Sequence, residues 1–265
     1  MLDIDRNQIH LWVAVFDKLR DEALLRRYQN LLTLEEQKQQ ARFYFAKDRQ
    51  RYLVTRALVR VVLSKYTTIE PQDWTFAVNS YGKPRIANVD DLAQRISFNI
   101  SHTNSLILLG VTGDIALGVD VENYCLREAP VDLADHFFAP EELEELRALP
   151  IALQHYRFFE YWTLKECYIK ARGMGLSVPL DQFGFRFPTD STLRAFMRPG
   201  LNDFASRWRF WQFRPSPCYL AAVCAEHCDV PPQLIVRTIA PLAEERVIEY
   251  ALLRTSEALP ATNAC

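Results

Sequence analysis

The strongest constraint on the fold is a pair of acidic residues inside an otherwise apolar segment that runs from Ile115 to Glu122. Its β-branched and aliphatic residues predict a strand, and side chains two positions apart on a strand share a face. Asp120 and Glu122 therefore point the same way, while Val119 and Val121 point the other way. Burying two like charges is unfavourable unless a cation or hydrogen-bond donors neutralise them. The segment predicts either a divalent-cation site or two solvent-facing carboxylates at a strand end.

Length and composition are those of a folded chain that forms one large domain or two small ones. The chain has 265 residues, of which 49% are hydrophobic and 24% charged, so disordered, collagen-like and coiled-coil classes are excluded. Its 31 basic and 33 acidic residues give a net charge of −2, and no global field would hold it on a polyanion. We therefore expect no nucleic-acid partner, and any phosphate binding must be local.

Neither the N-terminus nor any apolar run has the pattern of a targeting or membrane-spanning segment. The start of the chain is acidic, and no run approaches the roughly 18 to 20 apolar residues that a membrane span needs. We expect a cytoplasmic protein with no membrane partner, whose six cysteines are free thiols and form no disulfide. Cys224, His227 and Cys228 are soft ligands at close spacing, but no second ligand pair follows at finger spacing, so we favour no zinc site.

Hydrophobic periodicity predicts helices and strands in alternation along the chain. Helices are expected at Glu35–Leu63, Glu141–Leu149 and Leu153–Arg172, with a further amphipathic helix at the C-terminus. Strands are expected at Ile9–Phe16, Trp74–Val78, Phe98–His102, Leu106–Val111, Ile115–Glu122, Phe183–Phe187, Trp208–Arg214, Tyr219–Ala225 and Leu234–Ile239. The short polar link Thr112–Asp114 contains Gly113, which predicts that the strands on either side of it form a hairpin.

The predicted helix at Leu153–Arg172 carries the second group of chemically useful residues. Thr163, Glu166 and Lys170 recur at helical spacing and so share a face. An isolated Glu–Lys pair of this kind is usually a surface salt bridge, but the many aromatic residues around it favour a largely buried helix. Glu166 is therefore a candidate third acid for the cation.

Phosphate recognition must use side chains and ordinary turns, because the chain has no Walker loop, no Rossmann glycine fingerprint and no Gly-x-Ser-x-Gly elbow. The strand Phe98–His102 ends in polar residues, although a single histidine there is more often a capping or core residue. With Lys83 in the preceding turn and the arginines of the first long helix, His102 can form an anion site. Carboxylates and anion-binding groups on one chain together favour a Mg²⁺-bound polyphosphate ester as ligand.

Four motifs, taken in order, resemble those of the 4′-phosphopantetheinyl transferase superfamily. They are Tyr81-Gly-Lys-Pro84, Phe98-Asn-Ile-Ser-His102, Gly118-Val-Asp-Val-Glu122 and Trp162-Thr-Leu-Lys-Glu-Cys-Tyr-Ile-Lys170, the last continuing to Gly175-Leu-Ser-Val-Pro-Leu180. The set is similar to the monomeric branch that activates surfactin and related synthetases. The resemblance implies an α+β fold of two similar α/β halves related by a pseudo-two-fold, with the active site in the cleft between them. We expect the halves at residues 1–117 and 118–240, followed by a tail at 241–265.

The resemblance also implies a role for individual residues. The ligands of Mg²⁺ or Mn²⁺ would be Asp120, Glu122 and Glu166, with Glu166 as the base and Lys170 beside the diphosphate of coenzyme A, which is the substrate. The implied coenzyme A contacts are Lys38, Arg42, Arg51, Lys83, Pro84, Asn99, Ser101, His102, Lys165 and Lys170. Gln39 stands where relatives often carry a basic residue for the 3′-phosphate, so Lys38, Arg42 or Arg51 is expected to replace it.

The implied activity is transfer of 4′-phosphopantetheine from coenzyme A to a serine of an apo acyl, peptidyl or aryl carrier protein, with release of 3′,5′-ADP. A basic and apolar docking patch for that carrier is expected within residues 137–156. Two alternatives remain open: a catalytically silent module that binds coenzyme A or a carrier protein, and a Mg²⁺-dependent phosphodiesterase or nuclease. The near-neutral charge disfavours a nuclease, and the presence of every expected acid and of Lys170 disfavours a silent module.

Overall fold

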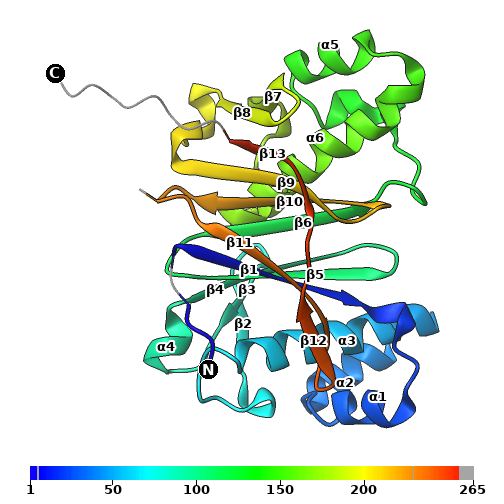
Figure 1. The fold of residues 1–265 in the computed structure, drawn as a ribbon, viewed down its shortest axis with the longest axis vertical. Helices are drawn as coiled ribbons and strands as arrows, with labels where there is room; N and C mark the ends of the chain where they lie inside the picture. The colour runs from blue at the N-terminus through cyan, green and yellow to red at the C-terminus, as the bar shows by residue number, and fades with distance from the viewer. Residues whose placement is uncertain (5, 229, 257–265) are drawn as a thin grey trace, which may run out of the picture. The chain divides into compact units, whose positions relative to one another are not determined.

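The computed structural model describes residues 1–4, 6–228 and 230–256, and the chain forms two compact units (Figure 1). Unit 1 comprises Met1–Ile115 together with Pro232–Glu249, and unit 2 comprises Ala116–Pro231 together with the chain from Tyr250 onward. Each unit pairs a β-sheet with helices, which confirms the predicted α+β class. Neither α6, the longest helix, nor any other helix in the described part of the chain has the length and apolar composition needed to cross a membrane.

Unit 1 is built on a five-stranded sheet with the order β12-β11-β1-β5-β4. Its strands are β1 (Gln8–Val15), β4 (Ile96–His102), β5 (Leu106–Gly113), β11 (Gln233–Ala240) and β12 (Glu244–Val247), with a separate hairpin of β2 (Phe76–Val78) and β3 (Pro84–Ile86). Its helices are α1 (Glu22–Gln29), α2 (Leu34–Ala41), α3 (Ala46–Leu63) and α4 (Asp91–Gln94), with 3₁₀ turns at Phe16–Lys18 and Pro71–Asp73.

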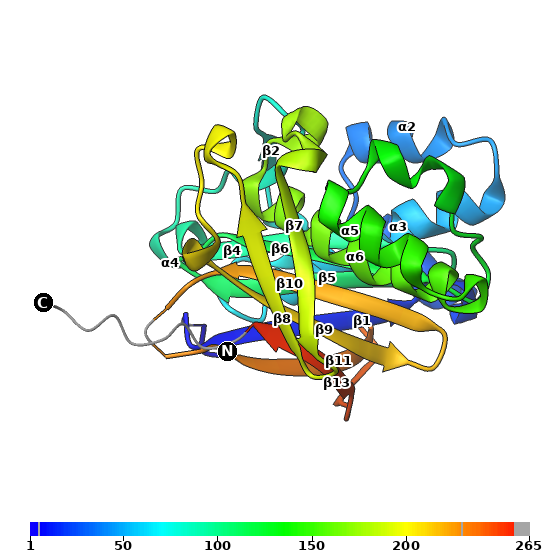
Figure 2. The ribbon, with the colours of Figure 1, turned by 90° about the horizontal axis from the view of Figure 1, so that it is seen from above.

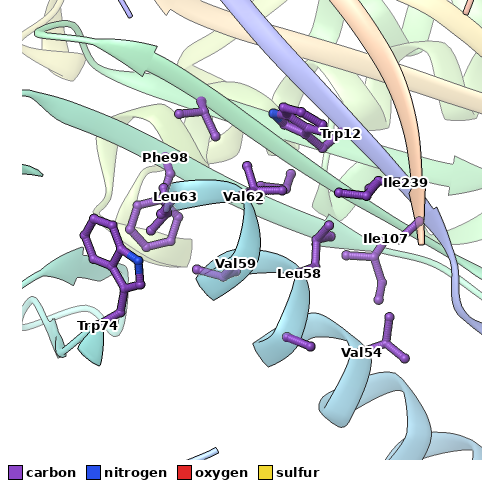
Figure 3. Close-up of a cluster of buried hydrophobic side chains, with 14 of the residues drawn as sticks. Trp12, Val54, Leu58, Val59, Val62, Leu63, Trp74, Phe98, Ile107 and Ile239 are labelled. Carbon is purple, nitrogen blue, oxygen red and sulfur yellow. The ribbon is translucent and has the colours of Figure 1, made fainter. Parts of the chain in front are cut away.

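The core of unit 1 lies between α3 and this sheet. Figure 3 shows Val54, Leu58 and Val62, which recur at helical spacing, turned toward Trp12 of β1 and Ile107 of β5. All five side chains are buried. Apolar burial of this kind contributes roughly 1.5–3 kcal/mol for each large side chain, so this contact holds the helix on the sheet.

The single helix predicted over Glu35–Leu63 is instead two helices separated by the turn at Arg42–Phe45. The Arg49 guanidinium donates to the carbonyl oxygens of Phe43 and Tyr44 at 2.8 and 2.9 Å, which satisfies backbone groups that a continuous helix would have bonded internally. Glu36 is buried and accepts from Arg60 at 2.9 Å, so an ion pair ties α2 to α3 across the break.

Unit 2 is built on a six-stranded sheet with the order β6-β10-β9-β13-β8-β7. Its strands are β6 (Leu117–Asn123), β7 (Phe183–Thr189), β8 (Thr192–Met197), β9 (Trp208–Ser216), β10 (Tyr219–Glu226) and β13 (Ala251–Ser256). Its helices are α5 (Pro140–Ala148) and α6 (Ile151–Arg172), which lie side by side (Figure 2), with 3₁₀ turns at Val131–His136, Gly175–Ser177, Leu180–Gln182, Pro199–Leu201 and Ala205–Arg207. As predicted, α6 ends at Gly173, whose φ of 67° is the left-handed cap that glycine adopts most readily.

The predicted hairpin of Leu106–Val111 and Ile115–Glu122 is wrong. Strand β5 pairs with β1 and β4 in unit 1, whereas β6 pairs with β10 in unit 2. Every residue of β6 is buried, so this strand needs cover on both faces, and α6 packs on one of them. Apolar character marked both segments as strands, but it carries no information about which strands pair.

The C-terminal part of the chain also differs from its prediction. Residues 233–240, expected in the second half, form β11 parallel to β1 in unit 1, so the chain returns to its first sheet. The expected terminal helix is wrong: the chain there forms β12 and then β13, which lies between β9 and β8 in the sheet of unit 2. Pairing with neighbouring strands, β11 for β12 and both β9 and β8 for β13, outweighs the weak helical periodicity of this segment. The rest of the expected tail, 257–265, lies outside the described residues.

The prediction that all cysteines are free is also wrong, because Cys125 and Cys218 form a disulfide with their Cα atoms 5.4 Å apart. Cys125 follows β6 and Cys218 stands in the turn between β9 and β10, and β10 pairs with both β6 and β9. The sheet therefore brings together two residues that are 93 positions apart, a separation that gives no sequence signal. Cys224 of the cluster considered for zinc is buried inside β10 and takes no part in a disulfide.

Candidate active site

The candidate site begins at β6, where Asp120 and Glu122 lie on one face of the strand and are only 4% and 7% exposed. Gly118, one step earlier on that face, touches the backbone of α6. A Cβ atom on Gly118 would stand 1.9 Å from the carbonyl oxygen of Cys167 and 2.3 Å from the amide nitrogen of Ala171. Glycine is therefore required here, and the close approach of strand and helix sets the spacing between their side chains.

Each of the two strand carboxylates meets a donor. The ammonium Nζ of Lys170, on α6, lies 2.6 Å from Oδ1 of Asp120. Glu122 forms an ion pair with Arg127, which follows β6, and accepts a hydrogen bond from the indole Nε1 of Trp162 at 3.2 Å. The predicted strand-end acids are thus buried and charge-compensated, which rules out the simple alternative of two solvent-facing carboxylates.

Glu166 lies on α6 one turn before Lys170, and its side chain is partly buried. Burial, followed by the negative charge of Asp120, raises the pKa of Glu166 to about 7, although the charge of Lys170 opposes this rise. Burial and then the charge of Asp120 likewise raise the pKa of Glu122. The three carboxylates therefore repel one another through a poorly solvated space, as expected of a site that receives a cation.

The chemistry of the donors fits Mg²⁺ or Mn²⁺, because carboxylate oxygens are the hard ligands that these ions prefer. Within residues 1–4, 6–228 and 230–256, no three His, Cys, Asp or Glu side chains are already arranged so that they could hold a metal ion. Mg²⁺ commonly keeps water and substrate phosphates among its ligands, so it does not need a complete protein cage. Burial is the main cause of the raised pKa of Glu166, and the repulsion from Asp120 and Glu122 that adds to it is what a bound divalent ion would relieve.

The structure contradicts the predicted coenzyme A contact of Lys165. This side chain has no exposed area, and its ammonium lies 2.8 Å from Oε2 of the equally buried Glu142. It also donates to the carbonyl oxygens of Leu180 and Phe183 at 2.8 and 2.6 Å, which uses all three ammonium donors. Lys165 points into the unit because it lies on the opposite side of α6 from the site, so its role is to join α6 to α5.

The residues expected to hold the nucleotide end of coenzyme A all lie in unit 1. Asn99 and Ser101 are buried on β4, and His102 is exposed at the end of this strand. Lys83 and Pro84 are at the turn into β3, which packs against β4. The Asn79 carboxamide oxygen accepts from the amide of Lys83 at 2.9 Å and shapes this turn.

The three basic residues considered as contacts of the 3′-phosphate also lie in unit 1, on α2, at the C-terminus of α2 and on α3. Lys38 is exposed on α2, and Arg42 caps the C-terminus of that helix and donates to Gln39 at 3.3 Å. Arg51 on α3 forms an ion pair with Asp48 at 3.0 Å.

Three residues of the site were missed from the sequence. Arg127 reaches Glu122 only because the chain turns after β6, and a basic residue five positions beyond an acid gives no signal of that turn. Trp162 is part of a recognised motif, but its donation to Glu122 depends on how α6 crosses the sheet. Gly118 was the most detectable of the three, since glycine is rare in this chain and is disfavoured inside an apolar strand.

Sequence comparison bears directly on this arrangement. The profile of the 4′-phosphopantetheinyl transferase superfamily matches residues 116–224, which contain all the site residues of unit 2, and the profile of the 4′-phosphopantetheinyl transferase N-terminal domain matches residues 21–112.

Curated relatives agree with both profiles. The chain is 32% identical over 198 residues to a 4′-phosphopantetheinyl transferase of Bacillus subtilis. This alignment covers 75% of this chain and 84% of the relative. It is 31% identical over 205 residues to 4′-phosphopantetheinyl transferase Sfp of Bacillus subtilis strain 168. This alignment covers 77% of this chain and 87% of the relative. It is 35% identical over 172 residues to 4′-phosphopantetheinyl transferase HetI of a Nostoc species. This alignment covers 64% of this chain and 71% of the relative. The chain therefore belongs to the 4′-phosphopantetheinyl transferase superfamily and is of the Sfp-like type.

Proposed function

We propose that the cluster of Asp120, Glu122, Glu166 and Lys170 is the centre at which this transferase moves 4′-phosphopantetheine from coenzyme A to a serine of an apo carrier protein. The observation that supports this most strongly is the set of two buried acids and one partly buried acid beside one lysine, all within unit 2. The same family membership makes coenzyme A and a carrier protein the partners of the reaction. We propose further that the enzyme acts as a monomer.

The reaction is a displacement at the phosphorus atom that carries pantetheine. The serine oxygen forms a new bond to that phosphorus, the bond to the other phosphate of the diphosphate breaks, and 3′,5′-ADP leaves. Asp120, Glu122 and Glu166 would hold Mg²⁺, which neutralises charge on the diphosphate when it is bound. Lys170 lies beside Asp120 and would stabilise the charge that develops on the leaving phosphate.

Glu166 is the proposed acceptor of the serine proton. In the metal-free protein, burial and then the charge of Asp120 raise the pKa of Glu166 to about 7; a bound cation would lower this pKa, so the carboxylate would be ionised and able to accept a proton at neutral pH. Asp120 is a poorer candidate because the Lys170 ammonium already occupies one of its oxygens at 2.6 Å. Glu122 is a poorer candidate for the same reason, because Arg127 and Trp162 both donate to it.

The carrier docking patch expected within residues 137–156 has unsuitable charge. Glu142 of α5 is buried against Lys165, but Glu141, Glu144 and Glu145 outnumber Arg147, the one basic residue of this helix, so α5 is unfavourable for the acidic helix that carriers of this type present. The turn between α2 and α3 is better matched, because Tyr44 and Phe45 are 86% and 64% exposed and Lys47 is exposed beside them. We therefore propose that the carrier contacts this turn and the start of α3, a surface defined as Tyr44, Phe45 and Lys47.

A pair of charge reversals separates the two docking surfaces. Lys47→Glu is expected to raise the KM for the carrier protein at least threefold while leaving the KM for coenzyme A unchanged, whereas Arg147→Glu on α5 should leave both unchanged. The opposite pattern would return the docking surface to residues 137–156.

The decisive test of the activity is the intact mass of an apo carrier protein after incubation with this chain, coenzyme A and Mg²⁺. A gain of one phosphopantetheine that disappears with EDTA is the expected result. Binding of coenzyme A without any mass gain on several carriers would favour the silent module. Loss of intact DNA or RNA under the same conditions would favour the phosphodiesterase or nuclease.

A further inference from the structure

We propose that Arg127 is a built-in competitor for the divalent cation, because it neutralises Glu122 when no metal is bound and must give up Oε1 of that carboxylate to a metal that uses this oxygen. The inference rests on the proposed function, in which Glu122 is a metal ligand. It goes beyond that function by making metal binding depend on where the Arg127 side chain lies.

The contacts of Glu122 carry the first step. Its carboxylate is 9% exposed, and Oε1 receives both the guanidinium of Arg127 and, at 3.2 Å, the indole Nε1 of Trp162. A buried carboxylate needs such donors, and the ion pair supplies a full positive charge on the oxygen that would otherwise face a cation. The guanidinium and a metal ion therefore cannot both use this oxygen fully.

The two side chains that donate to Glu122 differ in how freely they can move away from it. Trp162 is on α6 and is wedged between Phe158 and Phe137, with ring centroids 6.3 and 5.2 Å away. The Arg127 side chain is 47% exposed, so it can leave for solvent at little cost. Trp162 thus keeps the carboxylate oriented, while Arg127 is the donor that can be exchanged.

The backbone that carries Arg127 is anchored, so the exchange is a side-chain movement. The Asn123 carboxamide oxygen accepts from the amides of Cys125 and Leu126 at 3.1 Å each, and the amide of Arg127 donates to the Asn123 carbonyl at 3.2 Å. The disulfide of Cys125 with Cys218 ties the same turn to the sheet. Rotation about the Arg127 side chain is therefore sufficient to free Glu122.

A released guanidinium beside the cluster is available to an anion. Guanidinium binds phosphate oxygens in a bidentate manner, so a diphosphate is the ligand class that suits it best. Coenzyme A would then favour the metal-bound state by drawing Arg127 away from Glu122. Thermodynamic linkage requires that metal in turn favours coenzyme A by the same factor.

Binding of Mn²⁺ to the full-length chain, followed by electron paramagnetic resonance without coenzyme A, tests the competition directly. Arg127→Gln is expected to bind Mn²⁺ about two- to fivefold tighter than the wild type, the size of effect expected for removal of a partly exposed ion pair. Arg127→Lys, which keeps the charge, should return toward the wild-type affinity. Saturating coenzyme A should bring the affinities of wild type and Arg127→Gln together.

The matched control is Arg147→Gln, which removes the same charge from unit 2 at an exposed pair with Asp135 and should leave Mn²⁺ affinity unchanged. Equal or weaker Mn²⁺ binding by folded Arg127→Gln would overturn the inference while leaving the metal role of Glu122 intact. An equal gain in Arg147→Gln would also overturn it, because net charge would then explain the effect. Failure of every variant and of the wild type to bind Mn²⁺ would remove both the inference and the proposed metal role.

Discussion

Asp120 on β6 and Lys170 on α6 form an ion pair at 2.6 Å although 50 residues separate them in the chain. The contact depends on Gly118, because the strand can approach the helix this closely only where it has no side chain. It also places the proposed diphosphate contact against a proposed metal ligand. The geometry of the candidate site therefore follows from one strand-to-helix crossing, and several measurements test it.

Gly118→Ala is expected to destabilise the fold by about 1–3 kcal/mol or more, because its Cβ would collide with the backbone of α6 at Cys167 and Ala171. The free energy of unfolding in urea measures the loss. Gly200→Ala is the matched control, since its nearest neighbour would be a Gln182 side-chain oxygen at an ordinary 3.6 Å. Equal stability of the two variants would contradict the close crossing.

Glu166→Gln is expected to lower turnover by about a hundredfold or more with the fold intact, the effect typical of losing a general base. Single-turnover transfer to an apo carrier protein, followed by mass, gives the rate, and circular dichroism checks the fold. Glu128→Gln removes an exposed carboxylate from the turn after β6 and should keep the wild-type rate. Normal turnover by a folded Glu166→Gln enzyme would exclude Glu166 as the base.

The stability of the metal-free protein should fall as pH rises, and the stabilisation by added Mg²⁺ should grow. Burial and the Asp120 charge raise the pKa of Glu166 from 4.5 to about 7 in the folded state, so ionisation there opposes folding. The metal-free protein is therefore expected to lose stability as pH rises through this window, an effect fully developed above about pH 7. Since Mg²⁺ binds the ionised form, its addition should raise Tm more at about pH 8 than at about pH 5.5. A Mg²⁺-induced rise in Tm that is the same at both pH values would show that these carboxylates do not bind the ion.

Lys165→Met is expected to cost about 3–5 kcal/mol of stability, because it leaves the fully buried Glu142 without its ammonium partner. The KM for coenzyme A should stay unchanged at a temperature where the variant is folded, since Lys165 has no exposed area. Lys47→Met, at an exposed position, should change the unfolding free energy by less than about 0.5 kcal/mol. A raised KM for coenzyme A with normal stability would restore the original assignment of Lys165.

Removal of the disulfide by Cys125→Ser with Cys218→Ser is expected to destabilise the protein by about 2–5 kcal/mol, since the bond closes a loop of 93 residues. Reduction with dithiothreitol should lower the Tm of the wild type toward that of the double variant and should not affect the variant itself. Cys228→Ser, which changes a cysteine outside the disulfide, is the control and should behave as the wild type. A wild type that is insensitive to reductant would show that this pair is not bonded in solution.

Local pattern in the sequence was enough to predict the individual parts of the site. Alternation along β6 placed Asp120 and Glu122 on one face, and helical spacing on α6 placed Glu166 and Lys170 on one face. Both predictions depend only on the geometry of a single strand or helix, which is set by the backbone and does not change with its surroundings.

The tertiary structure alone decided which parts meet. It paired β6 with β10 rather than with β5, brought Cys125 to Cys218, turned Lys165 inward to Glu142 and brought Arg127 to Glu122. Each of these contacts joins residues from different elements or across a turn. An apolar strand can pair with many other strands, and a buried charge can be neutralised by many partners. Packing and burial over the whole unit decide which of these partners lies close enough to make the contact.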